Sequence, residues 1–329
     1  MLIDYRPIYP ADRVELAIPG GWQPDAHPEP RAIDLVRRTA AACRRIGIQR
    51  EAVIAAAGIA VVRMAIRHGS LGDDRHAYHN EDHLLDLLAD KLPALLAVAP
   101  LPLEQREALA LFCAFHDLRQ RETLRHDDGS IGANEAASLA EAERLLDALG
   151  LSGSVPRMAL RFAIIGSTFA TGADEHDLPR GAFAHRLAAW LDATHAGWRA
   201  DATTVEAEHL ARMAADIDTS NVASIYGDFA ESAAALATEL QFRAGRDLGS
   251  EAAGLSCLAF LTDGQERYIT VLQRFASFEG RTAFGAQRDA NAPRVREVSR
   301  RLRERFPEAV RPTGHDVIAA FRAIAAEAH

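Results

Sequence analysis

The sequence predicts an all-α protein, and three observations support this fold class. Alanine, leucine, arginine and glutamate dominate the chain, while valine, threonine and tyrosine are sparse, a balance that favours helices over strands. Apolar residues recur at helical spacing along most of the length, and no extended strand-like alternation occurs. No loop resembles a linker between domains, so we expect one helical domain over residues 31–329.

The first part of the chain combines an irregular arm with two helices. Residues 1–30 hold six prolines and the pair Gly20-Gly21, which blocks helix formation and predicts an arm that drapes over the body. We expect helices over residues 32–46 and 50–67. The second is apolar nearly all round, which is typical of a buried helix.

The middle of the chain predicts three more helices. Residues 80–98 are rich in leucine, and Pro93 should break or kink this helix near Leu92. Residues 103–118 predict a strongly apolar helix, and residues 134–149 predict an amphipathic one.

The C-terminal half predicts further helices, of which the last pack back on the domain. They are expected at about 154–168, 181–194, 203–216, 222–244, 250–278, 292–306 and 314–328. Residues 279–285 contain two glycines, and we expect a loop-rich stretch here that includes Arg281, Arg288 and Arg294 and could cover a site.

Charge and composition limit the function classes. The formal net charge is -9, which argues against a protein that coats nucleic acid. The three cysteines are widely spaced in apolar helical segments, so we expect buried thiols in a reducing compartment. The chain shows no secretory leader pattern and no apolar stretch of membrane-spanning length. We therefore expect a soluble cytoplasmic protein with no membrane partner.

The candidate chemistry begins with His79 and His83, which lie four residues apart at the start of a predicted helix. On a helix the two side chains would share one face, and such imidazole pairs hold zinc, iron or manganese. The alternative is a polar capping stretch without a metal. The zincin motif is excluded because Asn80, not glutamate, follows the first histidine.

Two further segments could complete a metal site. His116-Asp117 ends an otherwise apolar helix, where the pair would be costly to bury unless it were paired or bound to a metal. Asp216 and Asp218 end a later apolar helix, so one of them can supply a distant carboxylate while the other caps the following helix. The sequence leaves the choice between these two aspartates open.

The order of these motifs resembles the HD superfamily of metal-dependent phosphohydrolases. Tyr78-His79-Asn80-x-x-His83 is similar to the start of the class I cyclic nucleotide phosphodiesterase site, and Asp218-Thr219-Ser220-Asn221 resembles the segment with their last metal ligand. Asn134-Glu135-x-x-Ser138 is similar to a motif of bacterial HD proteins. The resemblance covers roughly residues 75–225. It implies an HD-type helical bundle with extra C-terminal helices.

The resemblance also implies a role for each residue. His83, His116, Asp117 and Asp218 would hold a first metal ion, and Asp117 would bridge to a second. His79 would protonate the leaving oxygen, a task that suits a histidine near neutral pH.

Four other residues are candidates for substrate contacts or for orienting the site. Asn80 and Glu135 could orient the metal ligands. Arg119, with the arginines that follow it, could meet a substrate phosphate; the alternative is a solvated basic loop. Gln273 lies in the region where the cyclic nucleotide enzymes hold the base with a glutamine, although its context differs from theirs.

We therefore expect a metal-dependent phosphohydrolase that uses a metal-activated water on a nucleotide or related phosphate ester, including a phosphodiester. Its cofactors would be one or two divalent ions, either manganese, iron or zinc, with magnesium as an option at a second site. The alternatives are an HD-fold di-iron oxygenase and a non-catalytic protein that binds a nucleotide or a partner. The complete ligand set favours catalysis over the non-catalytic alternative.

Overall fold

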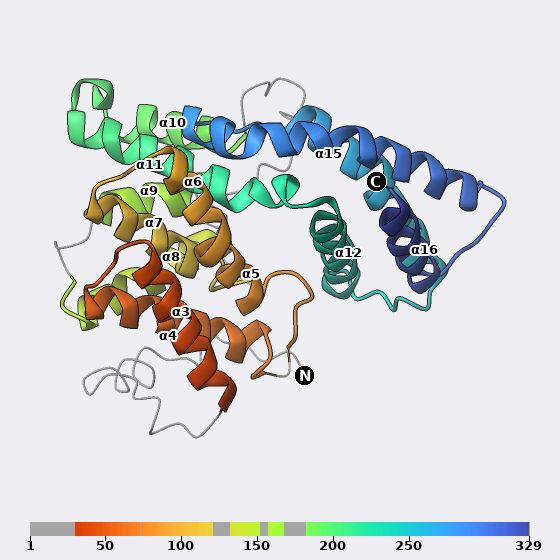
Figure 1. The fold of residues 1–329 in the computed structure, drawn as a ribbon, viewed down its shortest axis with the longest axis horizontal. Coiled ribbons are helices and arrows are strands. Elements are labelled where there is room, and N and C mark those ends of the chain that lie inside the picture. The colour runs from red at the N-terminus through yellow and green to blue at the C-terminus, as the bar shows by residue number, and fades with distance from the viewer. Residues whose placement is uncertain (1–29, 73, 121–131, 152–156, 168–181, 329) are drawn as a thin grey trace. The chain divides into compact units, whose positions relative to one another are not determined.

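The computed structural model describes residues 30–72, 74–120, 132–151, 157–167 and 182–328, with only the backbone described for residues 182–186. Within these ranges all regular elements are helices and no strand occurs (Figure 1), so the predicted all-α fold class is confirmed. The expected arm lies outside the described residues apart from Pro30, which begins the first helix. Among the described helices, none is long and apolar enough to cross a membrane.

The described chain divides into two compact units, which we treat separately. Unit 1 ends at Asp218 and also includes Ala276–Gly280, whereas unit 2 comprises Thr219–Phe275 and the residues from Arg281 onward. The expectation of a single domain over residues 31–329 stays a prediction.

Unit 1 is a bundle around α4 and α7. Its helices are α3 (Pro30–Arg45), α4 (Glu51–His68), α5 (Glu81–Asp86), α6 (Leu92–Val98), α7 (Leu103–Phe115), α8 (Ala133–Ala148), α9 (Arg157–Gly166), α10 (Ala182–Thr194) and α11 (Ala202–Asp218).

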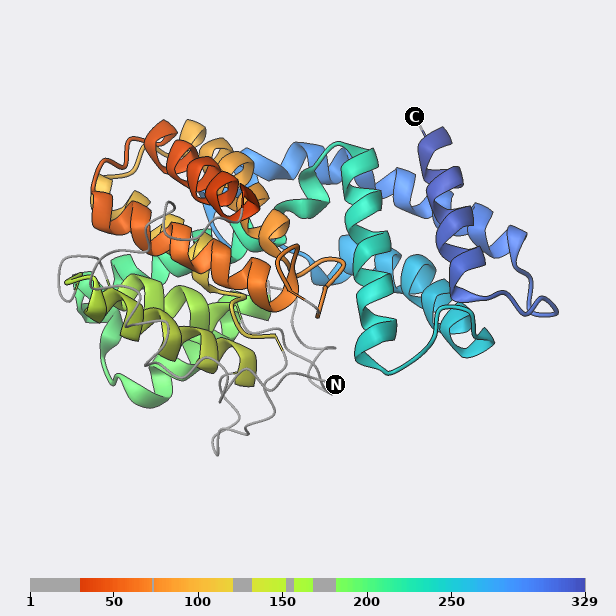
Figure 2. The ribbon, with the colours of Figure 1, turned by 90° about the horizontal axis from the view of Figure 1, so that it is seen from below.

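The centre of unit 1 follows directly from its most apolar segments. α4 packs against α3 and α7 (Figures 1 and 2), and α7 also contacts α5, α9 and α11. Every residue of α7 from Glu107 to Phe115 is buried, as expected for a helix that is apolar on all sides. The chain leaves this core at His116, which is buried as well.

The helix does not break near Leu92, and the predicted alternative of a kink there stays a prediction. A π-helical turn, Leu87–Lys91, joins α5 to α6, and Pro93 lies in the first turn of α6. Because proline has no N–H to donate, the backbone hydrogen-bond ladder is interrupted at this position. The helical run nevertheless continues through a widened turn instead of stopping.

Unit 2 contains α12 (Tyr226–Arg243), α13 (Glu251–Ala259), the short α14 (Gln265–Arg267) between two π-helical turns, α15 (Phe278–Arg305) and α16 (Gly314–Glu327). The first three residues of α15 belong to unit 1. α16 packs beside α12 and α13 (Figures 1 and 2). The hydroxyl of Thr313 and the carboxylate of Asp316 form a capping box that starts α16.

The predicted loop over residues 279–285 is wrong, because α15 is helical from Phe278. The glycine at 280 serves close packing and not a turn. A Cβ atom added there would collide with the carboxylate of Asp216. Arg281, Arg288 and Arg294 therefore lie on one helix and do not form a covering loop.

Candidate metal centre

Three residues from different helices form the core of the predicted site. His83 lies in α5, His116 follows α7, and Asp218 ends α11; one ligand atom from each lies within 4.8 Å of the others. Asp218 Oδ1 is 3.2 Å from His116 Nε2 and 3.8 Å from His83 Nε2. Around an ion bonded at about 2.0–2.1 Å, neighbouring ligand atoms are spaced by roughly 3.0–3.4 Å. The arrangement is therefore close to the size of a metal site.

Asp117 adds a second carboxylate to this group. Its Oδ2 atom is 3.1 Å from His116 Nε2 and 3.6 Å from His83 Nε2. Gln120 Nε2 donates a hydrogen bond of 2.8 Å to the other oxygen, Oδ1. Gln120 thus fixes the orientation of the carboxylate, a contact that the sequence analysis did not anticipate.

The histidine and the two carboxylates of this group shift each other's pKa values. Burial opposes a charge on His116, but the carboxylates of Asp117 and Asp218 raise its pKa well above the usual value. Burial likewise opposes ionisation of both aspartates, but His116 lowers the pKa of each. A divalent ion bound here would take over the role of the histidine proton, so metal binding would release protons.

His79 lies beside the group but not on the helix that the sequence predicts for it. α5 begins at Glu81 with Asn80 as its N-cap, so His79 precedes the helix. The argument that His79 and His83 share a helix face is therefore wrong. The turn nonetheless brings their ring centroids to 6.0 Å, and His79 is one of the charges that lower the pKa of Asp117.

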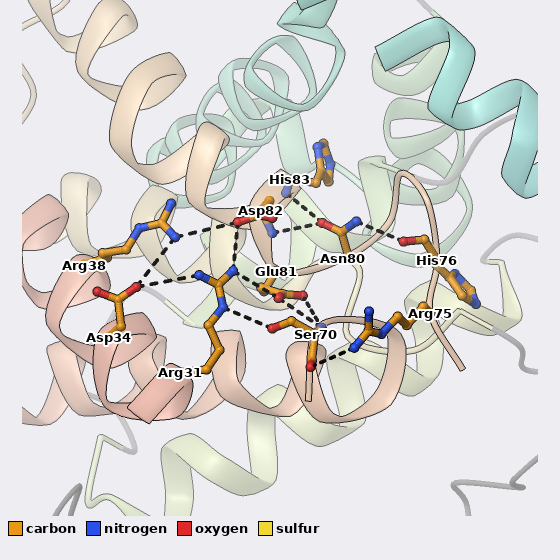
Figure 3. Close-up of polar contacts among 10 residues, drawn as sticks. All are labelled: Arg31, Asp34, Arg38, Ser70, Arg75, His76, Asn80, Glu81, Asp82 and His83. Carbon is orange, nitrogen blue, oxygen red and sulfur yellow. Dashed lines mark hydrogen bonds and ion pairs between the residues drawn. The ribbon is translucent and has the colours of Figure 1, made fainter. Parts of the chain in front are cut away.

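Asn80 positions His83 through the backbone. Its Oδ1 atom accepts hydrogen bonds from the backbone N–H groups of Asp82, at 2.9 Å, and His83, at 3.4 Å. Its Nδ2 atom donates to the carbonyl oxygen of His76 at 3.0 Å (Figure 3). These contacts cap α5 and tie its first turn to the preceding loop.

Glu81, a buried residue, fixes the first turn of α5 to the ends of two other helices. Glu81 accepts hydrogen bonds from the backbone N–H of Ser70, at 3.1 Å, and from Arg31 Nη2, at 3.3 Å (Figure 3). A Cβ atom added at Gly69 would collide with the Glu81 carboxylate. The start of α3, the end of α4 and the start of α5 are thereby held together.

Hydrogen bonding distinguishes Asp216 from Asp218. Asp216 accepts from the backbone N–H groups of Ala276, at 2.6 Å, and Ser277, at 2.8 Å, and from the Ser277 hydroxyl. Both of its oxygens are thus engaged by the segment that leads into α15. The cap of α15 is Ser277, whose hydroxyl accepts a hydrogen bond of 2.8 Å from the backbone N–H of Gly280. Asp218 is the residue that faces His83 and His116.

Arg119 is neither solvated nor directed at an open surface. It is 7% exposed, and its Nη1 atom is 3.5 Å from Glu141 Oε2. Glu141 also accepts hydrogen bonds of 2.7 Å from Arg63 and Arg67. The alternative of a solvated basic loop is therefore wrong for Arg119, and its contact with a substrate phosphate stays a prediction. Arg121 and Arg125 lie outside the described residues.

Glu135 lies in the first turn of α8, and the charges of the site affect its pKa. Burial raises its pKa, and the carboxylates of Asp117 and Asp218 raise it further. The role of Glu135 in orienting the metal ligands stays a prediction.

Gln273 belongs to unit 2. It is buried, and its Nε2 atom donates to Thr219 Oγ1 at 3.5 Å. The role of Gln273 in holding a base stays a prediction.

Sequence reasoning missed a second group of ligand types. His68, Asp74 and His76 also offer three ligand atoms within 4.8 Å of one another. The available signal was the density of histidines just before the His79-His83 motif.

Comparison with family models, curated proteins and solved structures finds no significant match to this chain. The chemistry of both groups therefore has to be argued from their own residues.

Proposed function

We propose that this protein is a metal-dependent phosphohydrolase whose ion is held by His83, His116, Asp117 and Asp218. The observation that carries the proposal is the convergence of two imidazoles and two carboxylates from three separate helical segments. Two nitrogen and two oxygen donors suit manganese, iron or zinc. The motif order that resembles the HD superfamily supports the same assignment.

The fit to an ion can be tested on His116. Its Nε2 atom is buried and lies within 3.2 Å of two carboxylate oxygens, yet within the described part of the chain it forms no hydrogen bond of acceptable geometry. Buried polar atoms normally have such a partner. A ring nitrogen that faces two carboxylates without a directed hydrogen bond is well suited to share an ion with them.

A bound divalent ion would supply an activated water and would neutralise charge on the phosphoryl oxygens. The protein supplies the remaining functions. Gln120 holds one oxygen of Asp117, and the Asn80 cap fixes the backbone of His83. His79 is the candidate to give a proton to the departing oxygen, since imidazole titrates near neutral pH.

The proposed substrate is a nucleotide or related phosphate ester, and the proposed location is the cytoplasm. Cys43, Cys113 and Cys257 are buried free thiols, which supports a reducing compartment.

The test is a screen of phosphomonoesters, linear phosphodiesters and cyclic phosphodiesters with manganese, iron or zinc added. We expect hydrolysis of at least one class, lost in His116→Ala and retained in His315→Ala, which changes an exposed histidine of unit 2. Failure to hydrolyse any class by protein that demonstrably holds metal would refute the phosphohydrolase and favour a binding role or oxygen chemistry.

A further inference from the structure

The second group of ligand types is a compact cluster at the end of α4. Asp74 Oδ2 is 3.4 Å from His68 Nδ1 and 3.5 Å from His76 Nε2. The two imidazole rings have a centroid separation of 4.3 Å. His68 and His76 are 1% and 5% exposed, and the Asp74 side chain is 17% exposed. The cluster is thus largely closed to water, with access through the carboxylate.

The backbone brings the ligands together without help from an ion. His68 is the last residue of α4, and its carbonyl oxygen accepts a hydrogen bond of 2.8 Å from the backbone N–H of His76. Residues 69–72 pack closely on the helix end, because a Cβ atom added at Gly72 would collide with the carbonyl of Ile66. The cluster is therefore preorganised by the turn.

The distances are closer to those around a shared ion than to those of an ideal hydrogen bond. N–H···O hydrogen bonds are usually about 2.7–3.2 Å long, and both contacts to Asp74 exceed that range. A tetrahedral ion with bonds of about 2.0–2.1 Å would space its ligand atoms by roughly 3.3–3.4 Å. The observed separations are close to the second value.

The residue types of the cluster suit a transition-metal ion. Two histidines and one carboxylate form a donor set that zinc commonly takes.

We propose that His68, Asp74 and His76 bind a transition-metal ion of the zinc type, at a site that shares no residue with the group around His116. The ion would cross-link the end of α4 to the segment that follows it. The carbonyl of His76 accepts the side-chain hydrogen bond of Asn80, the cap of α5 (Figure 3). The second site would therefore steady the segment that carries His83, and its role is structural.

The test isolates the second site in a chain whose first site is disabled. His116→Ala with Asp218→Ala removes two ligands of the first group, and the metal-free protein is then titrated with zinc or cobalt alone. We expect one ion per chain by elemental analysis, visible cobalt bands of tetrahedral intensity, and a higher unfolding temperature with zinc. Adding His76→Ala should reduce binding from one ion to none, whereas adding His315→Ala should leave it at one.

Two results would overturn the proposal. The first is a folded background variant, with the helical circular dichroism of the native chain, that binds no ion. The second is unchanged binding after His76→Ala is added. If the background variant does not fold, the native chain and Asp74→Asn are compared instead, and equal metal content refutes the site. None of these measurements uses enzyme activity, so they are independent of the proposed hydrolase function.

Discussion

Arg67 Nη2 donates a hydrogen bond of 2.7 Å to Glu141 Oε1, and both side chains are almost fully buried. The second nitrogen, Nη1, donates to the carbonyl oxygen of Leu118, the residue after His116-Asp117. Arg63 and Arg119 share the same carboxylate. One glutamate on α8 therefore anchors the end of α4 and the turn that carries two candidate metal ligands.

Removing this carboxylate should destabilise unit 1 strongly. Glu141→Gln would remove the charge of a carboxylate that three buried guanidinium groups contact, and breaking such a buried network costs about 3–5 kcal/mol. We expect a loss of this size in denaturant unfolding at pH 7. Glu143→Gln, on the same helix, is the control and should change stability by less than about 0.5 kcal/mol. Equal stability of the two variants would contradict the anchoring role.

The same glutamate predicts a pH dependence. Burial opposes the charge on Glu141, but Arg67 and Arg63 lower its pKa from 4.5 to about 2. A depressed pKa stabilises the folded state above the unfolded value, and this contribution, roughly 3 kcal/mol, is lost as pH falls from 4.5 toward 2. The stability difference between the native chain and Glu141→Gln should therefore shrink over this range. If the stability difference between the two proteins stays constant as the pH is lowered, this explanation is wrong.

His79 and His83 should have different roles, His79 as a proton donor and His83 as a metal ligand. His79→Ala should retain metal and lose turnover about 10²–10⁴-fold, the usual contribution of a general acid, whereas Asp117→Ala should lose both. The variants are compared by elemental analysis and by steady-state rates. Metal loss in His79→Ala would show that the roles are assigned wrongly.

A substrate series sharpens the same prediction. In a nitrophenyl phosphate ester the leaving group is acidic and departs without a proton. The hydrolysis rate of His79→Ala should therefore fall much less with this ester than with an alkyl ester. Equal impairment on both esters would point to a role for His79 in binding.

Apolar periodicity in the sequence predicted the presence of the helices better than it predicted where they begin and end. The apolar runs of α4 and α7 predict buried helices because such apolar segments are stable only inside the protein. The helical start at Phe278 depends on packing against Asp216, a partner distant in the sequence. Periodicity carries no information on such a contact.

The candidate site shows the same division. The ligand types of His83, His116 and Asp218 are visible in the motifs, and the structure brings them together. Asp216 could not be separated from Asp218 by sequence, since both follow the same apolar helix. The cluster of His68 and His76 was missed because a backbone hydrogen bond across a turn creates it.

The two aspartates of α11 should respond differently to the same change. Asp218→Asn should weaken metal binding with little loss of stability, because it removes a ligand charge at the candidate site. Asp216→Asn removes charge from a carboxylate that accepts three hydrogen bonds, and it should cost about 1–3 kcal/mol with metal content unchanged. Metal titration and denaturant unfolding of both variants provide the check, and the reverse pattern would exchange the two roles.

Two glycines of α15 offer a matched pair for the close approach at Asp216. Gly280→Ala introduces a Cβ that collides with the Asp216 carboxylate, whereas Gly285→Ala places its Cβ in open space. Neither glycine has a positive φ, so backbone strain does not distinguish them. Overpacking at residue 280 should cost about 1–3 kcal/mol, while the change at residue 285 should stabilise the helix by up to about 1 kcal/mol. Unfolding midpoints that move in the same direction for both variants would contradict the packing explanation for Gly280.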